Sequence, residues 1–237
     1  MTNYRVERAR DSQDLARRAA ETIAAQIDLA LDQRDRCQIA LSGGSTPANS
    51  YSLLGQERLP WDRVDVVLGD ERWVAAEDES SNAGMLRRTL LAPGPGASAS
   101  FHPVPTVELE SPEASAHAFA EQVSRLCSGV PPVFDVMLLG LGDDGHTASL
   151  FPGTDAPTVV DRWTTIGRGK GLDRITLTAP VLSAARQVIF LVSGAGKQEA
   201  LRRLLDPSES ADRTPARLVQ PASDVLILAD QDAAAGL

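Results

Sequence analysis

The segment Gly140–Gly153, with the sequence GLGDDGHTASLFPG, holds the residues best suited to chemistry in this chain. It follows the apolar run 136–139, so its glycines and acids are expected where a buried strand ends, and open α/β sheets bind ligands at such strand ends. The imidazole of His146 titrates near neutral pH and can act as a general base. Asp144, two residues before it, either orients the imidazole and raises its basicity or only caps the turn. His146 is therefore the leading candidate for a catalytic residue.

The first three glycines of this segment also match the G-x-G-x-x-G fingerprint of dinucleotide-binding proteins. Asp143 and Asp144 would then place two carboxylates where a pyrophosphate needs backbone amides and neutral surroundings. The fingerprint also does not account for His146 or for the Phe-Pro-Gly at 151–153. Dinucleotide binding is therefore disfavoured.

A second glycine-rich loop follows a short strand predicted at 37–41. Its hydroxyl and glycine residues are Ser42, Gly43, Gly44, Ser45 and Thr46. Thr46 is expected to cap a helix whose first residue is Pro47. The free amides and the positive dipole end of such a helix, together with the hydroxyls, favour a phosphate group. The loop lacks the G-x-x-x-x-G-K-[ST] pattern of a nucleoside triphosphate site, and a simple turn is the alternative.

Charged side chains follow two further strands. One buried strand leads into Asp70, Glu71 and Arg72, and in an extended segment Asp70 and Arg72 lie on one side while Glu71 faces elsewhere. Asp70 and Arg72 therefore either face a ligand together or form a surface ion pair. A later buried strand leads to Lys197 near the start of a helix, where a cation is unfavourable for the helix dipole unless an anion lies between them.

The segment 167–171 is rich in glycine, is basic through Arg168 and Lys170, and is expected to be a mobile loop. It either closes over a bound anion or is solvated surface. Strand signals occur around it at 159–160, 163–166 and 174–178, the last beginning with Arg174.

Helical and strand patterns alternate along the chain. Apolar residues at steps of four predict a helix over 11–31, and serines predict helix starts near 80–82 and at Ser111. Buried strands are expected at 37–41, 64–68, 136–139, 188–192 and 224–228. This alternation predicts a mainly parallel, doubly wound sheet with helices on both faces, in a single α/β domain over 1–237. Because the carboxyl ends of parallel strands share one edge, the polar loops are expected to form one site.

Composition limits the classes of partner. With 23 Lys plus Arg against 32 Asp plus Glu, the formal net charge of -9 opposes binding to nucleic acid or to an anionic membrane. Cys37 and Cys127 have no C-x-x-C spacing, and one histidine among scattered carboxylates makes no defined metal-ligand set, so neither a disulfide framework nor a metal site is expected. The polar N-terminal residues do not match a signal peptide, and no apolar run approaches the roughly 18 residues of a membrane span. We therefore expect a cytoplasmic monomer or small homo-oligomer that acts on a small molecule.

Together these motifs resemble those of the 6-phosphogluconolactonases, within the wider group that includes glucosamine-6-phosphate deaminases. The matching motifs are LSGGSTP at 41–47, GDERWV at 69–74, SN at 81–82, the segment 140–153, RITLT at 174–178 and SGAGK at 193–197. The resemblance therefore spans nearly the whole chain. After His146 the sequence TASLFP has the lactonase form, whereas the deaminases typically continue with IAFNEP. The chain departs from the lactonase pattern at Ala75, often proline there, and at Gly169 and Gly171, in a loop that is often proline-rich.

The resemblance implies hydrolysis of 6-phospho-D-glucono-1,5-lactone to 6-phosphogluconate, the second step of the oxidative pentose phosphate pathway, without a metal or organic cofactor. It implies that His146 is the general base for a water molecule, and that amides near Gly43 and Gly44 stabilise the oxyanion. The other implied site residues are Arg72 and Lys197 for the phosphate, Asp70 for sugar hydroxyls or for orienting Arg72, Asp144 for orienting His146, Arg174 for substrate binding, and Arg168 or Lys170 for a lid. A deaminase-like sugar-phosphate isomerase and a non-catalytic sugar-phosphate sensor are the alternatives.

Overall fold

The computed structural model describes residues 2–237 and contains two β-sheets. The central sheet has seven strands in the order β1-β10-β9-β6-β2-β3-β5, and its neighbouring strands are parallel. These strands are β1 (Tyr4–Ala9), β2 (Cys37–Leu41), β3 (Val64–Leu68), β5 (Ser100–Phe101), β6 (Val136–Gly140), β9 (Gln187–Val192) and β10 (Val225–Asp230). A smaller antiparallel sheet has the order β4-β8-β7 and consists of β4 (Asp70–Arg72), β7 (Thr164–Gly169) and β8 (Leu172–Leu177). The prediction of a mainly parallel sheet is confirmed.

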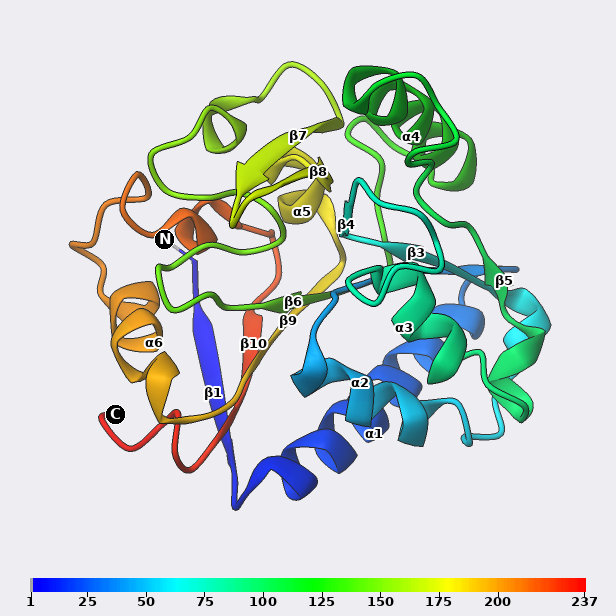
Figure 1. The fold of residues 1–237 in the computed structure, drawn as a ribbon. Coiled ribbons are helices and arrows are strands. Elements are labelled where there is room, and N and C mark those ends of the chain that lie inside the picture. The colour runs from blue at the N-terminus through cyan, green and yellow to red at the C-terminus, as the bar shows by residue number, and fades with distance from the viewer. Residues whose placement is uncertain (1) are drawn as a thin grey trace.

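Helices flank the central sheet (Figure 1). They are α1 (Ser12–Leu31), α2 (Ser45–Leu54), α3 (Asn82–Arg88), α4 (Pro112–Leu126), α5 (Ala179–Ala184) and α6 (Gln198–Leu205). In Figure 1, α1 and α2 lie side by side below the central strands, while α4 and the small sheet lie above them. The fold is therefore the doubly wound α/β arrangement expected from the sequence. Within residues 2–237, no helix has both the length and the apolar character that a bilayer crossing needs.

Burial explains why these segments form helices and strands. The apolar stripe of α1, which includes Leu15, Ile23 and Ile27, faces the core, and Asp11 caps the helix by accepting a hydrogen bond of 2.8 Å from the Asp14 N–H. The central strands β3 and β6 are covered on both faces, so their sequences are nearly continuous apolar runs.

The strand order reverses between β2 and β6. On one side of this point β2 is followed outward by β3 and β5, and on the other side β6 is followed by β9, β10 and β1. The loops after β2 and β6 therefore diverge, which opens a crevice at the carboxyl edge of the sheet. The loop after β9 reaches the same crevice, and the small sheet supplies another wall through β4 and the β7–β8 hairpin.

Three local predictions are wrong. The segment 159–160 forms no strand. The expected loop at 167–171 is instead the tip of the β7–β8 hairpin, with a tight turn in which Lys170 and Gly171 have φ angles of 54° and 80°. Helix α2 begins at Ser45 with Gly44, rather than Thr46, at its N-cap, because the Gly44 φ of 116° favours glycine and turns the chain two residues earlier.

Candidate active site

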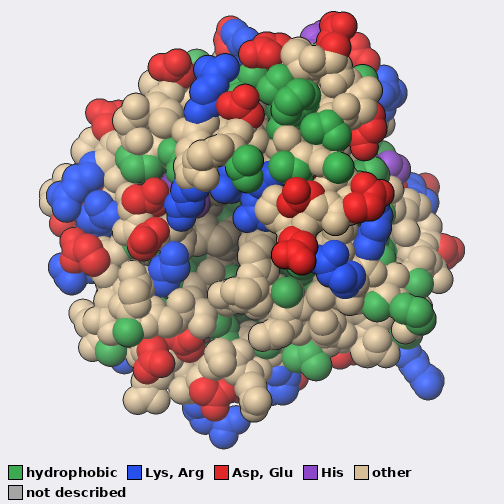
Figure 2. All heavy atoms as spheres, viewed as in Figure 1, with side chains coloured by type: hydrophobic (Ala, Val, Ile, Leu, Met, Phe, Trp, Pro, Cys, Tyr) green, Lys and Arg blue, Asp and Glu red, His purple; other side chains and the backbone are tan. Residues whose placement is uncertain are grey.

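A cavity of about 290 Å³ opens at the point where the strand order reverses. Figure 2 shows it as a hollow near the middle of the visible face, with Lys and Arg side chains beside it. The loops after β2, β6 and β9, strand β4, the start of α3 and the β7–β8 hairpin all contribute to its lining. The strand-end loops that carry the sequence motifs therefore meet in one cavity.

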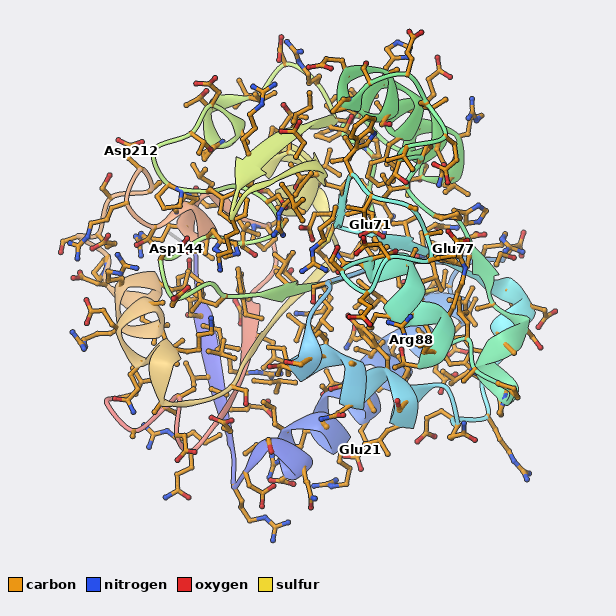
Figure 3. The ribbon with its side chains drawn as sticks, in the orientation of Figure 1. Glu21, Glu71, Glu77, Arg88, Asp144 and Asp212 are labelled. Atoms are coloured by element: carbon orange, nitrogen blue, oxygen red, sulfur yellow. The ribbon has the colours of Figure 1, made fainter. Side chains whose placement is uncertain are left out.

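His146 is fixed in the wall of this cavity by Asp144, which follows β6 and is labelled in Figure 3. The Nδ1 atom of His146 lies 2.5 Å from Oδ1 of Asp144, and the same oxygen accepts the His146 backbone N–H at 3.0 Å. Gly142 packs against the ring so closely that a Cβ atom there would lie 2.0 Å from Nδ1. If Nδ1 donates to Asp144, Nε2 is the ring nitrogen left to accept a proton.

Two opposing effects set the titration of His146. Burial lowers its pKa, the hydrogen bond and charge of Asp144 raise it, and the net direction is below the ordinary value of 6.5. Burial also raises the pKa of Asp144, but the hydrogen bonds from His146 and the charge of Lys170 outweigh burial and lower it. At neutral pH the pair is therefore a neutral imidazole beside a carboxylate, which is the state in which an imidazole accepts a proton.

Phe151 supports two polar residues of the site at once. Its ring centroid lies 4.5 Å from that of His146, and the Arg174 guanidinium lies 5.4 Å from the same centroid. The hairpin packs against the ring at Gly169, where a Cβ atom would lie 2.6 Å from a ring carbon. The positions of the imidazole and of Arg174 are therefore coupled through one aromatic side chain.

Asp70 and Arg174 form a buried polar pair across the small sheet. The Asp70 Oδ2 atom accepts a hydrogen bond of 2.5 Å from the Ser149 hydroxyl and lies 3.9 Å from Arg174 Nη1. Burial lowers the pKa of Arg174, and its Nε has no hydrogen-bond partner within residues 2–237. A buried cation with one distant carboxylate favours an electronegative ligand group in the cavity.

Asn82, the first residue of α3, joins three loops of the site. Its side-chain oxygen accepts a hydrogen bond from Arg72 Nη1, and its amide nitrogen donates to the Asp70 carbonyl at 2.9 Å. It also fills the space beside Gly43, where a Cβ atom would lie 1.9 Å from the Asn82 oxygen. The Ser80 carbonyl accepts a second bond from Arg72 at 2.6 Å. Asn82 and Ser80, rather than Asp70, therefore orient Arg72.

Glu71, labelled in Figure 3, holds the start of α3 in place. Its carboxylate accepts the backbone N–H groups of Arg72, Asn82 and Ala83 at 2.7–2.8 Å. Burial raises the pKa of Glu71 despite these bonds. The expected alternation along β4 is therefore present, since Asp70 and Arg72 line the cavity while Glu71 faces α3.

The first turn of α2 presents unused hydrogen-bonding groups to the cavity. Within residues 2–237 no side chain caps this helix, so the first-turn N–H groups of Ser45 and Thr46 are available to a ligand. The Ser42 Oγ lines the cavity, is buried and has no hydrogen-bond partner in the described residues. The Tyr51 hydroxyl fixes the Ser42 backbone by donating to its carbonyl at 2.8 Å and accepting its N–H at 3.0 Å. The loop is thus held rigid while its polar groups face an anion-sized space.

The loop after β9 is held by Asp230, the last residue of β10. Its carboxylate accepts the Ser193 hydroxyl at 2.5 Å, the Gly194 N–H at 3.0 Å and the Ala233 N–H at 2.8 Å. Ser193 and Lys197 both line the cavity.

The structure brings together most of the residues singled out from the sequence. Those that line the cavity are His146, Asp70, Ser42, Gly43, Gly44, Ser45, Thr46, Arg72, Lys170, Arg174 and Lys197. Asp144 lies behind His146 and is not a lining residue. Arg168 is not one either, since its exposed guanidinium lies 3.4 Å from Asp173 and 3.7 Å from Glu113.

The sequence did not single out the site contacts of Asn82, Ser193 and Asp230. Asn82 was visible as part of a helix start and of the SN motif at 81–82, whereas no motif included Asp230. Both bind groups that are distant in sequence, so no local pattern could have revealed their partners.

The fold and this cavity define an α/β protein with a small cavity lined by basic residues beside a carboxylate-paired histidine. The family described as Glucosamine-6-phosphate isomerases/6-phosphogluconolactonase matches residues 10–228, and the chain belongs to this family. The 6-phosphogluconolactonase of Synechocystis sp. is 41% identical over 230 residues, which cover 96% of this chain and 95% of that protein. That of Nostoc sp. is 40% identical over 235 residues and covers 98% of each chain. The solved structure of the 6-phosphogluconolactonase from Trypanosoma brucei is similar with a TM-score of 0.87 at 28% identity, covering 100% of both chains.

Proposed function

We propose that this protein hydrolyses 6-phospho-D-glucono-1,5-lactone to 6-phosphogluconate, in the oxidative pentose phosphate pathway. The family and the relatives named above support this substrate. The observation that carries the proposal is the His146–Asp144 pair, a neutral imidazole held by a carboxylate in the wall of a basic cavity.

The phosphate is proposed to lie among Arg72, Lys197 and the first turn of α2, which all line the same cavity. Arginine offers planar, paired donors to phosphate oxygens, and the uncapped helix end adds N–H groups and a positive dipole. Asn82 holds the Arg72 guanidinium before any ligand arrives, so little side-chain freedom is lost on binding.

The chemical step follows from the neutral state of His146. A lactone is an activated ester, so a water molecule can attack C1 directly once a base removes its proton. In the proposed step, Nε2 of His146 takes that proton as the new C–O bond forms, while Asp144 stabilises the resulting imidazolium through Nδ1. General base help of this kind is worth roughly 10²- to 10⁴-fold.

The tetrahedral intermediate then collapses with cleavage of the bond between C1 and the ring oxygen. The imidazolium returns the proton to the ring oxygen, which becomes the C5 hydroxyl, and the new carboxylic acid ionises in water. We assign stabilisation of the oxyanion to backbone amides near Gly43 and Gly44, which line the cavity. Asp70, with one oxygen bonded to Ser149, is proposed to accept a sugar hydroxyl with the other.

The test is a coupled assay of 6-phosphogluconate formation with purified protein and freshly generated lactone. We expect the wild type to accelerate hydrolysis and His146→Ala to lower kcat by at least about 10²-fold with little change in KM. His117→Ala is the matched control, since the His117 side chain on α4 is 79% exposed and does not line the cavity.

Full activity of His146→Ala would exclude this residue as the base. Ammonia release from glucosamine 6-phosphate would show a deaminase instead. Binding of 6-phosphogluconate without any acceleration of lactone hydrolysis would show a non-catalytic sensor.

A further inference from the structure

Ser193 is a lining residue of the cavity, and the proton of its hydroxyl group is already engaged. Its Oγ lies 2.5 Å from Oδ2 of Asp230, and that carboxylate also accepts the N–H groups of Gly194 and Ala233. An ionised carboxylate can only accept hydrogen bonds, so the proton in the short contact belongs to the serine. Asp230 is 4% exposed, which keeps water from competing for it.

This arrangement leaves the Ser193 oxygen free to act only as an acceptor. A hydroxyl has one proton and two lone pairs, and the proton here is donated away from the ligand space. No group within residues 2–237 donates a hydrogen bond to this oxygen. A ligand that satisfies it must therefore bring a donor.

The chemistry of the proposed substrate limits what that donor can be, and the step that follows rests on the proposed function. The phosphate dianion, the lactone carbonyl and the ring oxygen are all acceptors at neutral pH. The only donors on a phosphorylated hydroxy-lactone are its free hydroxyl groups, at C2, C3 and C4.

We infer that Ser193 is a specificity-determining residue, held by Asp230 as an acceptor for one ring hydroxyl of the sugar. It differs in this from Ser42, a lining residue of the same cavity whose hydroxyl has no partner within residues 2–237 and can either donate or accept. The inference concerns recognition of the hydroxyl pattern, and neither the phosphate contact nor the chemical step depends on it.

The experiment compares Ser193→Ala with wild type on four substrates: the parent lactone phosphate and its 2-deoxy, 3-deoxy and 4-deoxy analogues. We expect Ser193→Ala to lower kcat/KM for the parent about tenfold, as for the loss of one well-formed hydrogen bond. For one deoxy analogue, the kcat/KM of wild type should be lower by a similar factor, and Ser193→Ala should lower it no further, because that analogue lacks the hydroxyl that Ser193 binds. The other two should keep the roughly tenfold difference between the proteins.

If Ser193→Ala lowered kcat/KM by the same factor for all four substrates, the inference would be overturned, since this would mean that Ser193 only holds the loop. An unchanged kcat/KM on the parent would overturn it as well. Failure of wild type to accelerate hydrolysis of the parent would instead refute the proposed function, and the inference with it.

Ser208→Ala is the matched control. The Ser208 hydroxyl also donates to an aspartate, Asp206 at 2.7 Å, but Ser208 is exposed and does not line the cavity. The Ser208→Ala variant should leave all four kcat/KM values unchanged, and thermal melting of both variants would show that each is folded.

Discussion

Replacing Gly142 by alanine tests whether the position of the His146 ring controls the reaction. The added Cβ atom would lie 2.0 Å from His146 Nδ1 and 2.6 Å from Asp144 Oδ1, whereas an ordinary contact needs at least 3.4 Å. The ring must therefore move by about 1.4 Å, the difference between 3.4 Å and 2.0 Å. Phe151, with its centroid 4.5 Å from that of the imidazole, limits retreat on its side, so the contact with Asp144 is the one to break.

A misplacement of about 1 Å at a reacting group can cost about 10²-fold in rate. We therefore expect Gly142→Ala to lower kcat by about 10²-fold while KM changes little, because the proposed phosphate contacts lie in other loops. The assay is lactone hydrolysis over a range of substrate concentrations, together with a thermal melt to confirm folding. Gly69→Ala is the control, because Gly69 also lies just after a strand of the central sheet but a Cβ atom there would meet only the Leu41 carbonyl oxygen, at 3.8 Å.

If Gly142→Ala were folded and kept kcat within about twofold of wild type, the reasoning would be wrong. Either the imidazole would then not be the base, or its alignment on Asp144 would not matter to the step.

Two further predictions concern the charges of the site. Because burial lowers the pKa of His146 below 6.5 and the neutral ring is the active base, kcat/KM should fall with acid only below about pH 6.5, and a wild-type midpoint above pH 6.5 would contradict the assignment. Asp144→Asn loses the carboxylate that raises this pKa, so the midpoint of its pH profile should move to lower pH and its plateau kcat/KM should drop about 10²-fold or more. Arg72→Lys keeps the charge but not the paired donors held by Asn82, so KM should rise about tenfold with kcat nearly constant, and inhibition by inorganic phosphate should weaken in parallel. A change confined to kcat would place Arg72 at the reacting carbon instead.

Buried strands and the α1 helix could be predicted because their patterns are local. The strand 64–68 is an apolar run interrupted only by Asp65, and α1 repeats apolar residues at helical spacing. The strand signals at 163–166 and 174–178 match β7 and β8, but the continuation of β7 through Gly169 could not be predicted, because its glycines suggest a loop. Gly167 and Gly169 lie in a strand for a tertiary reason, namely that Ser149 and Phe151 occupy the space a side chain would fill.

The candidate site could be predicted as a set of motifs, but its internal contacts could not. His146, Arg72 and Lys197 follow predicted strands, and the shared edge of a parallel sheet brought them into one cavity. That Asn82 orients Arg72 depends on where α3 starts relative to β4, which is a matter of tertiary structure. The exclusion of Arg168 from the cavity likewise depends on the hairpin, since strand alternation turns it toward Glu113 and Asp173.

The aromatic ring shared by His146 and Arg174 has a consequence for engineering of the substrate range. Phe151 contacts both the imidazole of His146 and the guanidinium of Arg174, and the hairpin packs on it at Gly169. A library that diversifies Gly169 to reshape the pocket would shift this ring, and it would perturb reactivity together with selectivity. The loop after β9 is held by Asp230 and not by Phe151, so randomising this loop gives a way to vary selectivity separately from reactivity.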